Sequence, residues 1–244
     1  MAAVLVLSAA CATPEGSPTG YEVLGTLPHD TDAFTQGLEL VDGVLYEGTG
    51  LEGGSSLRRV DPGTGEVRHR VDLPESLFGE GITVVGDRIW QLTWRNRLAI
   101  ERNRETLEEV RRVTYKGEGW GLCHDGDRLV MSDGSDELTF RDPASFEETG
   151  TVAVRRDGQP VTRLNELECV DGQVWANVWL TDEVVRIDPA SGQVTAAVDL
   201  SGLRTADVPT DHVLNGIAAV PGTDEFLVTG KNWPTIFRIR FTRS

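Results

Sequence analysis

The sequence predicts an all-β fold: a five-bladed β-propeller with four antiparallel strands per blade. Two observations lead to this. A short core motif occurs five times along the chain, and each copy is followed by a tight-turn dipeptide and further β-rich runs. No helical periodicity is sustained anywhere. The 224 residues of 21–244 give about 45 residues per repeat, which is the length of a blade of four short strands.

The five core motifs define the first strand of each blade. They include F-T-Q-G-L, G-E-G-I-T and L-N-E-L-E, and they align on one central residue at spacings of 44, 40, 45 and 50 residues. We expect this strand to lie nearest the central channel. The aligned central residues are Gly37, Gly81, Gly121, Glu166 and Gly216.

Turn signals place the other strands. About five residues after each centre comes a dipeptide such as Asp42-Gly43 or Asp171-Gly172, which favours a tight hairpin into a second strand. A third run follows, and in three repeats it ends with Asp-Pro. Most repeats then have a fourth strand, as in 66–73. The last repeat stops after its third run, so we expect 21–27 to pair with it and close the ring.

The N-terminal segment 1–20 differs from the rest. An apolar run leads to small residues and then Cys11, which resembles the end of a bacterial lipoprotein signal, although a basic n-region is missing. The run is too short to span a membrane. We expect export, as a periplasmic or cell-surface lipoprotein or a secreted protein, with lipidated Cys11 as a candidate membrane attachment and 12–20 as a tether. A disordered leader is the alternative. Residues 21–244 are then a single catalytic domain.

Composition excludes several classes of function. The formal net charge is −16 and no local basic patch is visible, so nucleic-acid binding is not expected. The three cysteines form no C-x-x-C pair and the four histidines are not at ligand spacing, which argues against a zinc ribbon, a disulfide scaffold or a dedicated metal site. Cys123 and Cys169 fall in adjacent inner strands, and we expect buried free thiols. No cofactor is predicted to be required, but the sequence leaves open whether a structural calcium or other ion is bound in the channel. We expect a monomer.

The repeats predict a site on one face of the propeller. The start of the first strand and the end of the second strand lie at the same end of a hairpin. The residues just before the aligned centres, and those about thirteen after them, therefore meet at one channel mouth. Apolar walls with a few convergent polar groups are typical of a small-molecule pocket. The first group is Gln36, Glu80, Trp120, Asn165 and Asn215, and the second is Trp94 and Trp179, with Lys231 and Trp233 in the corresponding loop of the fifth blade.

Each candidate also has a purely structural interpretation. Glu80 could be a solvated rim residue, Lys231 a surface charge, and Asn165 and Asn215 turn formers. The tryptophans could pack between blades, which we expect for Trp90 and Trp175 in mid-strand. The shared repeat positions favour a site. The segment 48–53 matches G-x-G-x-x-G, but a β-strand follows it where a dinucleotide site needs a helix, so it is a glycine-rich loop at the same mouth.

Five segments resemble the glutamine cyclotransferase family, the plant and bacterial type of glutaminyl-peptide cyclotransferase. They are F-T-Q-G-L, G-E-G-I-T, L-N-E-L-E, W-x-x-x-x-[VI]-x-R-I-D at 179–188 and the terminal segment with G-K-N-W-P, and the resemblance covers about residues 21–242. It implies a five-bladed propeller that converts the N-terminal glutamine of peptides or proteins into pyroglutamate with release of ammonia.

The resemblance also implies roles for individual residues. Glu80 of G-E-G-I-T falls on the catalytic carboxylate and would act as general acid and base. The chemistry of the reaction adds that the oxygen of the tetrahedral intermediate needs hydrogen-bond donors, which Lys231 or Asn165 could provide. The substrate-contacting positions fall on Phe34, Gln36, Trp94, Trp120, Asn165, Trp179 and Lys231, and the repeat register adds Asn215 and Trp233.

Two other functions stay open from the sequence alone. One is a non-catalytic propeller that binds a partner. The other is a calcium-dependent lactonase-like hydrolase, in which Glu80, Asn165 and Asn215 could be ligands in the channel. A binding module has no need of a buried carboxylate among tryptophans, and a lactonase should show several Asn, Asp and Glu ligands that converge.

Overall fold

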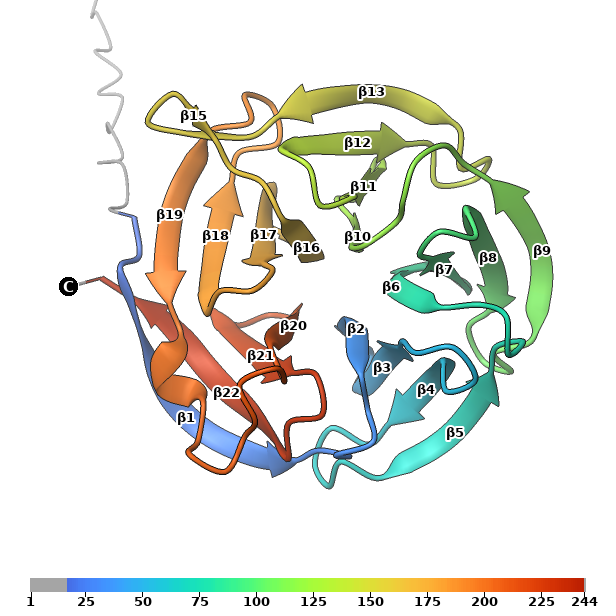
Figure 1. Ribbon diagram of the computed structural model, residues 1–244, viewed down its shortest axis with the longest axis horizontal. Coiled ribbons are helices and arrows are strands. Elements are labelled where there is room, and N and C mark those ends of the chain that lie inside the picture. The colour runs from blue at the N-terminus through green and yellow to red at the C-terminus, as the bar shows by residue number, and fades with distance from the viewer. Residues whose placement is uncertain (1–16, 244) are drawn as a thin grey trace, which may run out of the picture.

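Five four-stranded antiparallel sheets surround a central axis in the computed structural model, which describes residues 17–243 (Figure 1). The predicted five-bladed propeller is confirmed. In each blade the strands run outward from the axis in the order in which they are hydrogen-bonded. Among the described residues, no helix is long and apolar enough to cross a membrane.

The first two blades are built from consecutive strands. Blade 1 contains β2 (Thr35–Val41), β3 (Val44–Thr49), β4 (Ser56–Val60) and β5 (Val67–Asp72). Blade 2 contains β6 (Gly79–Val85), β7 (Arg88–Thr93), β8 (Leu98–Asn103) and β9 (Glu109–Thr114).

Blades 3 and 4 have the same order, with a small hairpin between them. Blade 3 contains β10 (Leu122–His124), β11 (Leu129–Met131), β12 (Glu137–Arg141) and β13 (Glu148–Ala153). The hairpin is β14 (Arg155–Arg156) and β15 (Gln159–Pro160). Blade 4 contains β16 (Leu164–Val170), β17 (Gln173–Val178), β18 (Glu183–Ile187) and β19 (Val194–Asp199).

Blade 5 joins the two ends of the chain. A 3₁₀ turn (Ser201–Leu203) leads to β20 (Leu214–Ala219), β21 (Glu225–Gly230) and β22 (Thr235–Thr242), and the outer strand is β1 (Gly20–Pro28). The register pairs Tyr21 with Phe241 and Leu27 with Ile236. The N-terminal strand therefore closes the ring as predicted, and Figure 1 shows it outside β22.

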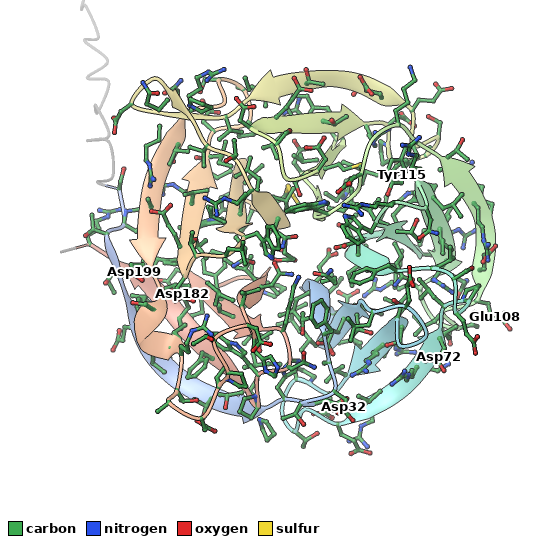
Figure 2. All side chains as sticks on the ribbon, viewed as in Figure 1. Asp32, Asp72, Glu108, Tyr115, Asp182 and Asp199 are labelled. Carbon is green, nitrogen blue, oxygen red and sulfur yellow. A yellow bond between two sulfur atoms is a disulfide. The ribbon has the colours of Figure 1, made fainter. Side chains whose placement is uncertain are left out.

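Burial follows the distance from the axis. The inner strand β6 is buried at six consecutive positions, whereas the outer strands β5 and β9 are mostly exposed. Acidic side chains such as Asp72, Glu108 and Asp199 lie at the outer circumference (Figure 2). The hairpin between β2 and β3 turns through Asp42 and Gly43, both with positive φ, as a two-residue turn of this kind requires.

Glycine at the aligned centres lets neighbouring inner strands approach closely. A Cβ on Gly121 would lie 2.0 Å from the carbonyl oxygen of Asn165 in the next blade. Blade 4 has Glu166 at this position. Its two carboxylate oxygens accept hydrogen bonds from the backbone N–H of Leu38 (3.2 Å) and of Ile217 (2.8 Å). The inner strands of blades 4, 1 and 5 are thus joined.

The two mid-strand tryptophans fill the spaces between blades, as predicted. Trp90 packs against Phe146 with ring centroids 4.8 Å apart, and its Nε1 donates to the carbonyl oxygen of Pro143 (2.9 Å). Trp175 is stacked on Phe241 at 4.2 Å. Each contact joins one blade to the next along the chain.

The expectation of free thiols is wrong, because Cys123 and Cys169 form a disulfide. It joins β10 of blade 3 to β16 of blade 4, with the Cα atoms 5.4 Å apart. The two positions differ by one residue in the repeat alignment. A β-bulge between Leu164 and Leu167 inserts one extra residue into β16. An alignment of the repeats without gaps ignores this residue, so the two cysteines look offset in the sequence.

We expect Cys169→Ser to lower the free energy of unfolding by about 2–4 kcal/mol, since the bond closes a loop across two blades. For a chain of this size the melting temperature should fall by about 4–16 °C. Thermal unfolding with and without dithiothreitol measures the effect, and the double variant with Cys123→Ser is the control, because reductant should not change it. Equal melting temperatures for wild type and Cys169→Ser would show that the bond adds no stability.

Candidate active site

A cavity of about 310 Å³ opens at one end of the channel. All five blades contribute to its wall, and most of the lining is apolar or aromatic. A volume near 300 Å³ is at the lower end of the range for small-molecule sites. The lining residues are Phe34, Gln36, Phe78, Glu80, Trp94, Trp120, Asn165, Trp179, Leu180, Asp211, Val213 and Lys231.

Eight of the ten predicted site residues line this cavity. The exceptions, Asn215 and Trp233, lie behind the wall. Asn215 is fully buried, and its Nδ2 donates to Gln36 Oε1 (3.2 Å) and to the carbonyl oxygen of Thr35 (3.0 Å). Trp233 is 1% exposed, and its Nε1 donates to the carbonyl oxygen of His212 (2.8 Å). Both hold cavity residues or their loops in place.

A β-bulge occurs at the start of the first strand in four of the five blades, and in blades 1, 2 and 4 it presents a residue that lines the cavity. The pairing of the first two strands shifts at 35–37, 79–82, 164–167 and 214–217, where Gln36, Glu80, Asn165 and Asn215 are found. A bulge re-aims a side chain out of the regular alternation. This is how residues of an inner strand come to face the channel mouth.

The sequence analysis missed four lining residues. Two of them follow the repeat: Phe78 and Val213 occupy the position three before the aligned centre, where Phe34 also lies. Leu180 comes directly after Trp179 and has a positive φ of 64°. Asp211 lies in the segment before β20, which belongs to no repeat, so neither of these two had a signal in the sequence.

The cavity walls form a chain of aromatic contacts. Phe34 meets Phe78 edge-on at 6.2 Å between ring centroids, and Phe78 lies 5.5 Å from Trp94. On the other side, Trp120 and Trp179 are T-shaped at 5.4 Å. Such geometries are favourable for quadrupolar rings. The wall is therefore pre-formed.

Two ionisable groups are buried in the cavity. Glu80 is 4% exposed, and burial raises the pKa of its carboxyl well above the usual value, an effect opposed by Lys231 and assisted by Glu118. Lys231 is 6% exposed, with Nζ 4.6 Å from the ring centroid of Phe34. Burial lowers the pKa of Lys231 to about 8, although Glu80 opposes the change. Lys231 can thus change protonation state at accessible pH.

Comparison with known proteins identifies the family. The model of the glutamine cyclotransferase family matches residues 1–241 of the chain. The chain belongs to this family. Glutaminyl-peptide cyclotransferase from Arabidopsis thaliana is 38% identical over 229 residues, which are 91% of this chain and 72% of the plant protein.

Solved structures support the assignment of the chain to this family. The crystal structure of Myxococcus xanthus glutaminyl cyclase superposes with a TM-score of 0.84 at 37% identity, over 93% of this cyclotransferase-family chain and 98% of that one. The Neurospora crassa Pan2 WD40 domain reaches a TM-score of 0.52 at 8% identity, over 86% and 77% of the two chains. That likeness shows the propeller fold alone.

Two further acidic side chains of the inner strands accept hydrogen bonds from the protein itself. Glu39 Oε2 accepts from the backbone N–H of Val84 (2.7 Å), and both oxygens of Glu166 accept from backbone N–H groups. Within residues 17–243, no group of three or more His, Cys, Asp or Glu side chains is arranged to hold a metal ion.

Proposed function

We propose that this member of the glutamine cyclotransferase family converts the N-terminal glutamine of peptides and proteins into pyroglutamate. The single observation that carries the proposal is the buried pair of Glu80 and Lys231 inside the aromatic cavity. A carboxyl whose pKa is raised by burial suits proton transfer near neutral pH. The cyclotransferase from A. thaliana and the cyclase from M. xanthus support the assignment through their names and their similarity over most of this chain.

In the proposed reaction the α-amine attacks the γ-carboxamide carbon of the same residue. A C–N bond forms to close the lactam ring, and the bond to the amide nitrogen breaks. The attacking nitrogen must lose a proton and the leaving nitrogen must gain one. Glu80 accepts the first proton and donates it to the leaving ammonia, so the protein returns to its starting state. General acid–base catalysis of this kind contributes roughly 10²–10⁴ in rate.

In this scheme Lys231 stabilises the carbonyl oxygen and Asn165 orients the amine. The Lys231 ammonium can donate to the oxygen that becomes negative in the tetrahedral intermediate. The Oδ1 of Asn165 is buried without a hydrogen-bond partner among the described residues. A buried acceptor in this position is suited to an N–H of the substrate.

The aromatic wall would surround the glutamine side chain. Phe34, Trp94, Trp120 and Trp179 present ring surfaces that can contact the two methylene groups and exclude water. A curled conformation of the substrate brings the amine close to the carbonyl carbon. Holding two reacting groups together in this way accounts for a large part of the rate of many intramolecular reactions.

The alternatives have less support from the geometry. A calcium-dependent lactonase would need Glu80, Asn165 and Asn215 to converge, but Asn215 is fully buried behind Gln36 and does not line the cavity that contains the other two. A binding module gives no reason to bury a lysine beside a carboxyl at the cost of desolvating both.

Incubation of the purified protein with a Gln-initiated dipeptide tests the proposed function, with ammonia release as the readout. N-acetylated Gln dipeptide is the matched control because it has no free amine. We expect ammonia from the first substrate only. Absence of ammonia from the free dipeptide would refute the proposal.

Turnover should be unchanged in EDTA, because the proposed steps use only side chains of the chain itself. Initial rates before and after dialysis against the chelator measure this. Loss of activity that added zinc or calcium restores would instead indicate an essential metal ion.

We also propose that the protein is exported. The disulfide between Cys123 and Cys169 supports an oxidising compartment. Cys11, the predicted lipid attachment site, lies outside the described residues. Fractionation of cells that express wild type and Cys11→Ser tests the attachment: the wild type should be recovered with membranes and the variant in the soluble fraction. Equal distribution of the two would contradict lipidation.

A further inference from the structure

Glu118 accepts hydrogen bonds from one tryptophan of blade 2 and one of blade 3, although the proposed reaction gives it no role. Its Oε2 accepts hydrogen bonds from Trp94 Nε1 (2.7 Å) and from Trp120 Nε1 (3.1 Å). Its Oε1 accepts from Arg95 Nε (3.0 Å). One carboxylate therefore joins two parts of the aromatic wall that come from different blades.

We propose that Glu118 is a positioning residue for the cavity: it fixes the orientation of Trp94 and Trp120 and places a negative charge beside the wall that they form. The inference deepens the proposed function and rests on it.

The orientation argument follows from the chemistry of indole. Each tryptophan has a single N–H and no acceptor, so a hydrogen bond at Nε1 fixes the rotation of the whole ring. Because both N–H groups are directed to Glu118, the rings offer the substrate their faces and not their donors. A face can contact the glutamine methylenes without competing for the carboxamide.

Other neighbours also confine the two indole rings that Glu118 binds. The guanidinium of Arg95 lies 3.9 Å from the ring centroid of Trp94, on the indole that Glu118 also binds. A Cβ on Gly119 would lie 2.2 Å from the hydroxyl oxygen of Tyr115. A Cβ on Gly134 would lie 2.6 Å from the ring of Trp120, which is thus confined from a second side.

Three ionisable groups interact electrostatically with Glu80. Lys231 is a buried cation and favours the carboxylate, whereas Glu118 favours the carboxylic acid. Tyr115 is the third group, and Figure 2 labels it where blades 2 and 3 meet. Its hydroxyl donates to the carbonyl oxygen of Thr93, and burial and the charge of Glu80 raise its pKa, so it stays neutral.

Glu118 itself is an anion at neutral pH. Burial acts to raise the pKa of its carboxyl, but the hydrogen bonds from Trp120, Arg95 and Trp94 outweigh this and lower it. Its side chain is 36% exposed, so solvent and salt weaken the field that reaches Glu80. The expected effect on Glu80 is therefore moderate and should decrease at high salt.

Two substitutions separate orientation from charge. Glu118→Gln keeps an oxygen that can accept from the indoles but removes the charge. We expect the acid limb of the pH profile of kcat/KM for a Gln dipeptide to move to lower pH by roughly 0.3–1 unit, with KM nearly unchanged. Glu118→Ala removes both the acceptor and the charge, and KM should rise roughly tenfold as well.

Glu137→Gln is the matched control. It removes one negative charge from an exposed position at the start of β12, and its pH profile should coincide with that of wild type. A pH profile of Glu118→Gln identical to wild type, together with an unchanged KM in Glu118→Ala, would overturn the inference.

A second readout needs no turnover. The indole N–H resonances of Trp94 and Trp120, assigned by substitution of each ring, should shift in Glu118→Ala and stay unchanged in Glu137→Gln. If the wild type has no cyclase activity but the resonances shift in Glu118→Ala, the proposed function is refuted and the orienting role stands. Unshifted resonances would refute the orienting role whatever the activity.

Discussion

Glu80→Gln lowers kcat for a Gln-initiated dipeptide by about 10² or more and leaves substrate binding nearly intact. Glutamine has the shape of glutamate and can donate a hydrogen bond, but it cannot carry a proton from one nitrogen to another. The expected loss therefore falls on kcat and not on KM. Because Glu80 is buried in the cavity wall and its pKa is raised by burial, solvent cannot readily take over the transfer.

Steady-state rates of ammonia release by wild type and variant measure this effect. Both proteins must show the same melting curve, so that a folding defect is not mistaken for a catalytic one. Retention of more than about half of kcat would show that Glu80 is not the proton carrier under the general acid–base account.

Lys231→Met should lower kcat by about 10²–10³, which is the usual cost of losing one donor to a tetrahedral intermediate. The same change should move the acid limb of the kcat/KM profile to higher pH. The cation of Lys231 holds down the pKa of Glu80, so its removal lets that pKa rise further. This shift has the opposite sign to the one expected for Glu118→Gln.

The only other lysine of the chain provides the control. Lys116 is exposed, and Lys116→Met should keep the wild-type kcat. A Lys231→Met variant with wild-type kcat would remove the ammonium from the reaction scheme. An acid limb that moves to lower pH would contradict the proposed pairing of Lys231 with Glu80.

The repeat register predicted most of the site because a hairpin fixes the position of its ends. In blade 2 the backbone N–H of Trp94, thirteen residues after the aligned centre, donates to the carbonyl oxygen of Phe78, three residues before it. In blade 4 Trp179 donates to Arg163 at the same two positions. The same pattern would have indicated Phe78 and Val213 as lining residues.

Blade 5 shows why the register did not place every residue. Its second strand ends two residues further from the aligned centre than the second strands of blades 2 and 4. As a result, the backbone N–H of Lys231 donates to the carbonyl oxygen of Val213. Lys231 therefore occupies the position of Trp94 and Trp179. Trp233 comes two residues further on, where the chain turns back and its N–H donates to the carbonyl of Gly230. The tryptophan is buried behind the wall for this reason.

Contacts between distant segments were beyond the reach of the sequence. The disulfide depends on the bulge in β16, and Asp211 reaches the cavity from a segment outside the repeats. Glu118 precedes Trp120 by two residues, but its hydrogen bond to Trp94 depends on how blades 2 and 3 pack. Local patterns encode strands and turns, whereas such contacts follow from the closed ring.

The most direct test of the central claim is the product formed from a Gln dipeptide whose γ-carboxamide carries ¹⁵N. The proposed mechanism predicts ¹⁵N-ammonia together with a dipeptide that is lighter by one ammonia and has no free amine. Mass spectrometry and reaction with an amine reagent identify both products. A dipeptide with N-terminal glutamate and a free amine would show that water, and not the α-amine, attacks the carboxamide, and would contradict cyclisation.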